Sequence, residues 1–133
     1  MPKHESKFWQ KVKEKLSPHF ILNRMELATI SGFPDIVLYK KNGTFATIEL
    51  KVTQTNLVRL SPHQIGFHIR HPKNTFILVS AAPLSMQKLN DKDSSDSILL
   101  YKGSSCSELA AQGLKLAPFI TGWELIIQHL SRL

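Results

Sequence analysis

Two acidic residues and a lysine are spaced so that they could carry out metal-dependent hydrolysis. Thirteen residues separate Asp35 from Glu49, and Lys51 follows Glu49 by two positions. Two carboxylates can hold Mg²⁺, and an ammonium group beside them can serve a water molecule or a phosphate. Hydrolysis of a phosphodiester requires these groups. The prediction therefore depends on the elements that would bring the three side chains together.

The residues around these three side chains predict a β-hairpin. Residues 36–39 are apolar and rich in β-branched side chains, Lys41-Asn42-Gly43 carries a turn signal, and residues 44–52 alternate. The period of two places Glu49 and Lys51 on the same face of their strand.

The length of the loop decides whether Asp35 joins that face. A two-residue loop would set Asp35 opposite Leu50, on the wrong face. A three-residue loop with Gly43 in the left-handed conformation sets Asp35 directly across from Glu49. Directly opposed carboxylates, about 5 Å apart at Cβ, either share a cation or keep a proton. The three-residue register therefore predicts a metal site.

Other segments predict helices and strands around this hairpin. Helical spacing predicts a basic amphipathic helix over 3–16, and Ser61-Pro62 is typical of a helix start, with the end near His71-Pro72. A capping box of Thr121 and Glu124 predicts a last helix over 122–132. The remaining predictions are a short strand or extended connection over 20–27, strands over 75–80 and 98–102, and a short helix after Ser107. The length of 133 residues fits one domain over 1–133.

Composition narrows the classes of partner. With 17 Lys and Arg against 10 Asp and Glu, the net charge of +7 favours a polyanion, and nucleic acid is the first candidate. A membrane surface or heparin-like polymer is less favoured, because no basic helix has a wide apolar face. Cys106 is the sole cysteine, so no intramolecular disulfide can form. No apolar run approaches ~18 residues, which predicts no membrane span and a cytoplasmic protein.

The motif residues resemble a known nuclease family. Pro34-Asp35 followed by Glu49-Leu50-Lys51 resembles the PD-(D/E)XK nuclease superfamily, whose signature is that dipeptide, a spacer, and acid-any-lysine on the next strand. The flanking segments look like its phage-type, VRR-NUC and Holliday-junction-resolvase branches. The resemblance covers most of residues 1–80, and nothing beyond Pro83 is specific to the family.

The resemblance implies both a fold and a mechanism. It implies a restriction-endonuclease-like α/β core, with a central mixed β-sheet flanked by helices. Asp35 and Glu49 would be ligands of Mg²⁺ or Mn²⁺, and Lys51 would orient the attacking water or help to deprotonate it. Gln64 would match the glutamine that several members place on the helix after the lysine strand.

A third acidic ligand has two candidates. Glu5 lies on the apolar stripe of the first helix, where many superfamily members carry a metal-binding glutamate, although an acid in the first turn is also favoured by the helix dipole. Glu26, close before Gly32, is the competing candidate. A zinc site built from His63, His68 and His71 is disfavoured, because their spacing fits no known zinc pattern and they read as exposed helix residues.

The substrate is predicted to be DNA, bound chiefly through its phosphates. The candidate contacts share a basic or polar side chain on an element expected to flank the site. They are Lys7, Lys11, Lys15, Arg59, His68, Arg70 and Lys73. The small chain has no evident recognition domain, which favours structure-selective cutting of branched or junction DNA in recombination, repair or phage DNA processing. A homodimer would suit such a symmetric substrate.

Two other classes of function remain open from the sequence. A nucleic-acid-binding module could keep the nuclease fold without chemistry, although the intact Asp35, Glu49 and Lys51 argue against it. A purely structural or partner-binding domain of a phage or repair complex is the third reading. RNA as the substrate also stays open.

Overall fold

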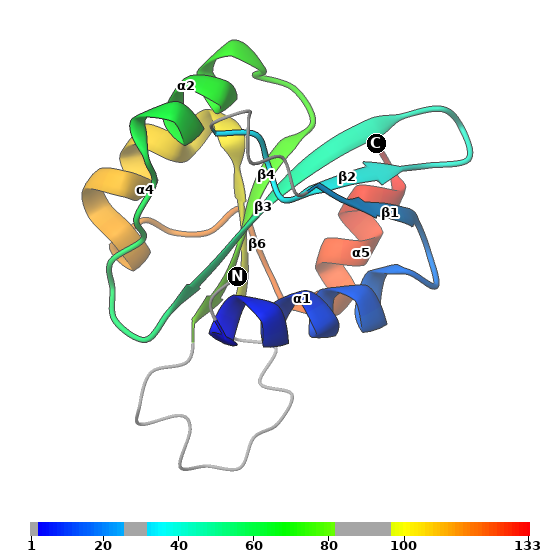
Figure 1. The fold of residues 1–133 in the computed structure, drawn as a ribbon, viewed down its shortest axis with the longest axis horizontal. Helices are drawn as coiled ribbons and strands as arrows, with labels where there is room; N and C mark the ends of the chain where they lie inside the picture. The colour runs from blue at the N-terminus through cyan, green and yellow to red at the C-terminus, as the bar shows by residue number, and fades with distance from the viewer. Residues whose placement is uncertain (1–2, 26–31, 82–96) are drawn as a thin grey trace.

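The computed structural model describes residues 3–25, 32–81 and 97–133, which form one six-stranded sheet with helices on both faces (Figure 1). The strands are β1 Ile21–Arg24, β2 Ile36–Tyr39, β3 Phe45–Thr53, β4 Thr75–Ala81, β5 Ile98–Lys102 and β6 Ile120–Thr121. The helices are α1 Lys3–Leu16, α2 Pro62–Arg70, α4 Cys106–Gln112 and α5 Trp123–Ser131, with short 3-10 turns η2 Gly103–Ser105 and η3 Gly113–Lys115. The predicted α/β class with a mixed sheet and flanking helices is confirmed.

The sheet is mixed because one connection crosses over its face. The spatial order of the strands follows the sequence, from β1 to β6, and neighbouring strands are antiparallel except for β3 and β4. Parallel neighbours need a crossover connection, and α2 supplies it here. The crossover carries α2 back over β3, the strand that bears Glu49 and Lys51.

The two faces of the sheet bury separate apolar clusters. On the first face, which carries Ile48 and Leu50, the sheet packs against α1 and α5 through residues such as Val12 and Ile126. On the second face, Ile77 and Val79 of β4 and Tyr101 of β5 pack against Cys106 and Leu109 of α4, with Ile65 of α2 beside them. Figure 1 shows α2 and α4 on one side of the sheet and α1 and α5 on the other.

The β2–β3 hairpin has the predicted three-residue loop. The Lys40 N–H donates to the Thr44 carbonyl at 2.9 Å, and Gly43 has φ +90°, the left-handed conformation that glycine adopts at no steric cost. The paired residues run from Tyr39 and Phe45 to Ile36 and Ile48. One more step along this register sets Asp35 directly across from Glu49, as predicted.

The start of α2 also confirms its prediction. The Ser61 hydroxyl accepts from the Gln64 N–H at 3.1 Å, and the Gln64 side-chain oxygen accepts from the Ser61 N–H at 2.9 Å. Pro62 occupies the first turn, where its missing N–H costs nothing. This reciprocal capping box satisfies two backbone groups at the helix end and fixes the Gln64 side chain.

The predicted capping box at the start of the last helix is wrong. Gly122, with φ +92°, precedes α5, and no side chain caps the helix. Thr121 instead pairs with Leu99 as part of β6. A Thr-x-x-Glu pattern reflects only the local sequence, and here Thr121 pairs within the sheet instead of capping the helix. Strand β6 was not predicted, because two residues are too few to show a period.

Within the described ranges, no helix combines the length and apolar character that a membrane span needs.

Candidate metal and phosphate site

Asp35 and Glu49 form the centre of the candidate site. Asp35 directly precedes β2, and its Oδ2 accepts a hydrogen bond from the Leu50 N–H at 2.8 Å. This bond turns the Asp35 carboxylate toward β3. Glu49 lies in the middle of β3 and is only 3% exposed, a depth that strand alternation alone does not reveal. The sequence therefore predicted the pairing of the two acids but not the depth of Glu49.

Glu49 is held in an environment that disfavours its charge. Burial, and next the neighbouring Asp35 carboxylate, raise the pKa of Glu49 to about 9, while Lys51 opposes the shift and Glu5 adds to it. Its Oε1 is buried and has no hydrogen-bond partner in the described part of the chain. Two close carboxylates with an unpaired buried oxygen either retain a proton or bind a cation. The donor set therefore fits a hard divalent ion.

Gln64 bridges the acid and the lysine. Its Nε2 donates to Glu49 Oε2 at 3.1 Å, and its Oε1 accepts from Lys51 Nζ at 3.0 Å. Because Oε1 also accepts from the Ser61 N–H, the bridge is anchored to the start of α2. The sequence predicted Gln64 as a site residue, and the structure brings it to Glu49 and Lys51.

The floor of the site beside Glu49 and Lys51 is apolar. Glu49 pairs with Ile77 and Lys51 with Val79 on the parallel strand β4, and both of these neighbours are fully buried. Apolar neighbours exclude water and lower the local dielectric, which strengthens interactions between charges. Lys51 is half-buried beside this floor, and its Nζ lies 3.0 Å from Gln64 Oε1.

The loop that leads to Asp35 packs against the start of α2. Gly32 has φ +83°, and a Cβ there would lie 2.4 Å from the His63 carbonyl carbon, so only glycine fits. The Phe33 and Phe67 rings meet edge to face at 5.4 Å. These contacts fix the position of Asp35 relative to Gln64. The Gly32-Phe33-Pro34 sequence does not by itself reveal this packing against α2.

Among the described residues, no third acidic ligand joins Asp35 and Glu49. Across residues 3–25, 32–81 and 97–133, no group of three or more His, Cys, Asp or Glu side chains is placed to hold a metal ion. Glu5 is half-buried on α1, and its charge is felt at Glu49. Glu26 lies outside the described residues. Mg²⁺ is commonly held by one or two carboxylates, with water and substrate phosphates completing the shell, so the pair suffices.

His68 does not lie where the sequence analysis placed it. It was expected on an exposed helix face in contact with DNA, yet it is 0% exposed. A Cβ added to Gly103 would lie 2.6 Å from its Nδ1, so the missing side chain of Gly103 makes room for the ring. Burial, with the positive charges of His71 and Lys51, lowers the pKa of His68 to about 4. A buried, neutral ring cannot contact a phosphate, so His68 is removed from the DNA contacts. His63 and His71 are exposed, as expected.

The other predicted phosphate contacts divide between the two sides of the sheet. Lys7, Lys11 and Lys15 lie on α1, over the first face, and Lys11 also lies 3.9 Å from Glu14. Arg59 and Arg70 precede and end α2, and Lys73 follows it, beside the second face. These last three side chains are exposed. The second group is therefore on the side from which Glu49 and Lys51 project.

One signal in the sequence supports this site and was not used for its prediction. Between residues 27 and 90 the chain has two acidic residues, Asp35 and Glu49, against seven Lys and Arg. Isolated acids in so basic a stretch would be expected to point at separate lysines. They face each other instead.

Comparison with known protein families and with curated proteins finds no match for this chain.

Proposed function

We propose that this protein is a metal-dependent endonuclease that hydrolyses DNA phosphodiester bonds, with a restriction-endonuclease-like core of the PD-(D/E)XK type. The observation that carries the proposal is the pairing of Asp35 and Glu49 across the hairpin, in which Glu49 is buried and its Oε1 has no hydrogen-bond partner among the described residues. Lys51, two residues further along the same face, completes the acid-any-lysine group.

The two carboxylates would hold Mg²⁺ or Mn²⁺. When bound, the cation would polarise the scissile phosphate and lower the pKa of its water. Asp35 is suited to this because its Oδ2 is fixed by the Leu50 N–H and its carboxylate lies close enough to Glu49 to raise the pKa of that group. Glu49 must give up its proton to bind a cation, so binding is coupled to proton release.

Lys51 and Gln64 would act on the water and the phosphate. Gln64 holds the Lys51 ammonium group by one end of its amide and Glu49 by the other, so the two functional groups keep a fixed separation. Lys51 Nζ has donors left over after its bond to Gln64. Those donors can orient the attacking water or neutralise a phosphate oxygen. Gln64 is a positioning residue in this scheme.

Charge supports a nucleic acid as the substrate. Apart from the two paired acids, residues 27–90 carry only basic charges, and the whole chain has a net charge of +7. Such a surface attracts phosphates without reading bases. We therefore propose that the protein selects branched DNA by its structure. We also propose that it acts as a homodimer in the cytoplasm.

The alternative is a nucleic-acid-binding module that has a nuclease fold but no chemistry. Its support is the same basic surface, which would bind phosphates with or without a metal. Nucleic-acid binding that is unchanged by Mg²⁺ and by substitution of Asp35 would favour this alternative.

A cleavage panel separates the two. Linear, single-stranded, flapped and four-way DNA, with matching RNA, should be incubated with wild type and Asp35→Ala, each with Mg²⁺ and with EDTA. We expect cutting that needs Mg²⁺ and is lost in Asp35→Ala, with the preferred substrate showing the role. Glu14→Ala, an exposed acid on α1, is the matched control. If no substrate is cut and binding ignores both metal and mutation, the nuclease proposal fails.

A further inference from the structure

Three side chains form one row at the outer end of the second face, and two of them are exposed while Tyr39 is half-buried. Ile21 of β1 pairs with Tyr39 of β2, and Tyr39 pairs with Phe45 of β3, so the three side chains project on the same side. Ile21 is 53% exposed and Phe45 58% exposed. The Tyr39 and Phe45 rings are tilted, with centroids 4.8 Å apart. We call this row the aromatic platform.

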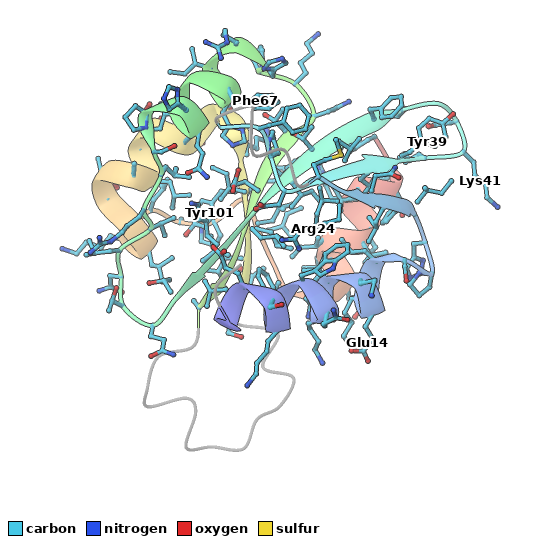
Figure 2. All side chains as sticks on the ribbon, in the orientation of Figure 1. Glu14, Arg24, Tyr39, Lys41, Phe67 and Tyr101 are labelled. Carbon is cyan, nitrogen blue, oxygen red and sulfur yellow. The ribbon has the colours of Figure 1, made fainter. Side chains whose placement is uncertain are left out.

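The platform lies on the same strands and the same face as the candidate site. Tyr39 follows Asp35 by four residues, and Phe45 precedes Glu49 by four. Four residues of a strand span about 13 Å. The platform and the candidate site are therefore near neighbours on one face of the sheet. Helices α2 and α4 lie over the other end of this face, and Figure 2 shows Tyr39 and Lys41 at the outer part of the hairpin, away from them.

The rim of the platform is basic. Lys41 is exposed in the hairpin loop. On the other side, Asn74 Nδ2 donates to the Phe45 carbonyl at 3.3 Å, so Lys73, the residue before Asn74, lies near this end of β3. Lys73 is exposed. There is no acidic residue in 36–48 or 50–81.

This combination favours a nucleic acid over a second copy of the chain. Two identical platforms brought face to face would place lysines of both copies near one another without an acid in those stretches to pair them. The exposed Phe45 ring, with exposed lysines nearby, instead matches bases joined by phosphates, since every base offers a face for stacking and every link a negative charge.

We propose that the aromatic platform binds unpaired bases of a nucleic acid, and that it selects substrates with a single-stranded segment beside the cleavage point. The binding step stands on the platform alone. The selection of the cleavage point rests on the proposed function, because it assumes that Asp35 and Glu49 act on the same strand.

The test is fluorescence anisotropy with a short fluorescein-labelled oligothymidine and with a blunt duplex, both in EDTA so that no cleavage occurs. Phe45→Ala is expected to weaken binding of the single strand about tenfold and to leave the duplex unchanged. Phe119→Ala is the matched control, because Phe119 is an exposed aromatic at 42% that contacts Lys102 and follows α4 near the opposite edge of the sheet. It should bind both probes as wild type does.

Phe45→Trp gives a second readout that a merely structural role would not produce. It should retain affinity for the single strand, and its added indole fluorescence should be quenched on binding. Equal losses for both probes in Phe45→Ala, or no loss for either, would overturn the proposal. So would a wild-type dimer that Phe45→Ala converts to a monomer in sedimentation, because the platform would then be a dimer interface. Since cleavage is not measured, these outcomes are independent of whether Asp35→Ala abolishes cutting.

Discussion

The two faces of strand β3 differ although their residues alternate along one short segment. On the first face, Ala46, Ile48 and Leu50 are at most 2% exposed and lie within one apolar cluster. On the second face, Glu49 is as deeply buried, but one of its oxygens has no partner in the described ranges. The first face gains stability from burial, whereas the second holds a charge-bearing group at a cost. The apolar side chains of β3 therefore contribute to the core, whereas Glu49 on the other face is suited to the cation binding that we propose.

The largest expected effect on stability comes from the first face. Ile48→Ala should lower the free energy of unfolding by about 2–5 kcal/mol, because it leaves a cavity at a fully buried position. Urea unfolding measures the change. Thr47→Ala, at the neighbouring half-buried position, is the control and should cost far less. Similar losses for the two variants would remove the contrast between the faces.

In the absence of metal, Glu49→Gln should raise the free energy of unfolding, whereas Ile48→Ala lowers it. The unfolded chain loses the Glu49 proton near pH 4.5, while the folded chain keeps it up to about pH 9. The folded state binds more protons between these values, so wild-type stability should fall as pH rises across this range. The variant lacks this loss and should melt at a higher Tm than wild type at pH 8 in EDTA. Parallel pH profiles for the two proteins would contradict the buried, protonated state of Glu49.

A smaller effect is expected from the bridge between the acid and the lysine. Gln64→Ala removes the bonds to Glu49 and Lys51, and we expect about tenfold slower cleavage of the preferred substrate. Because Gln64 also caps α2, Ser61→Ala is the matched control. It removes the hydroxyl cap, costing about 1 kcal/mol of stability, but leaves the bridge in place. If both variants slow cleavage equally, the role of Gln64 is helix capping alone.

The smallest effect concerns the phosphate contacts on the two sides of the sheet. Lys73→Ala, on the side of the second face, should reduce the slope of log affinity against log salt by about 1. Lys15→Ala on α1 should change this slope less, since α1 covers the first face. Binding of a labelled duplex over a series of salt concentrations gives both slopes. A larger change in Lys15→Ala would place the nucleic acid on the side of α1 instead.

The sequence predicted the features that depend on interactions between residues close together in the chain. The hairpin register follows from strand alternation and from Gly43 in the loop, and the capping box of α2 follows from Ser61 and Gln64. These are interactions between residues close in the chain. His68 was misplaced because its burial depends on Gly103, far away in sequence and lacking a side chain. The position of Asp35 over Gln64 likewise depends on the contact of Gly32 with His63, which no periodicity reveals.

The central claim is that Asp35 and Glu49 together hold a divalent cation. The most direct test is Mn²⁺ binding, followed by the loss of the free-ion signal in electron paramagnetic resonance, for wild type, Asp35→Asn and Glu49→Gln, with Glu14→Gln as the control. We expect wild type and Glu14→Gln to bind Mn²⁺ with an affinity that rises as pH increases toward 9. Asp35→Asn and Glu49→Gln should each bind Mn²⁺ at least about tenfold more weakly. Equal affinity in all four proteins, independent of pH, would contradict the central claim.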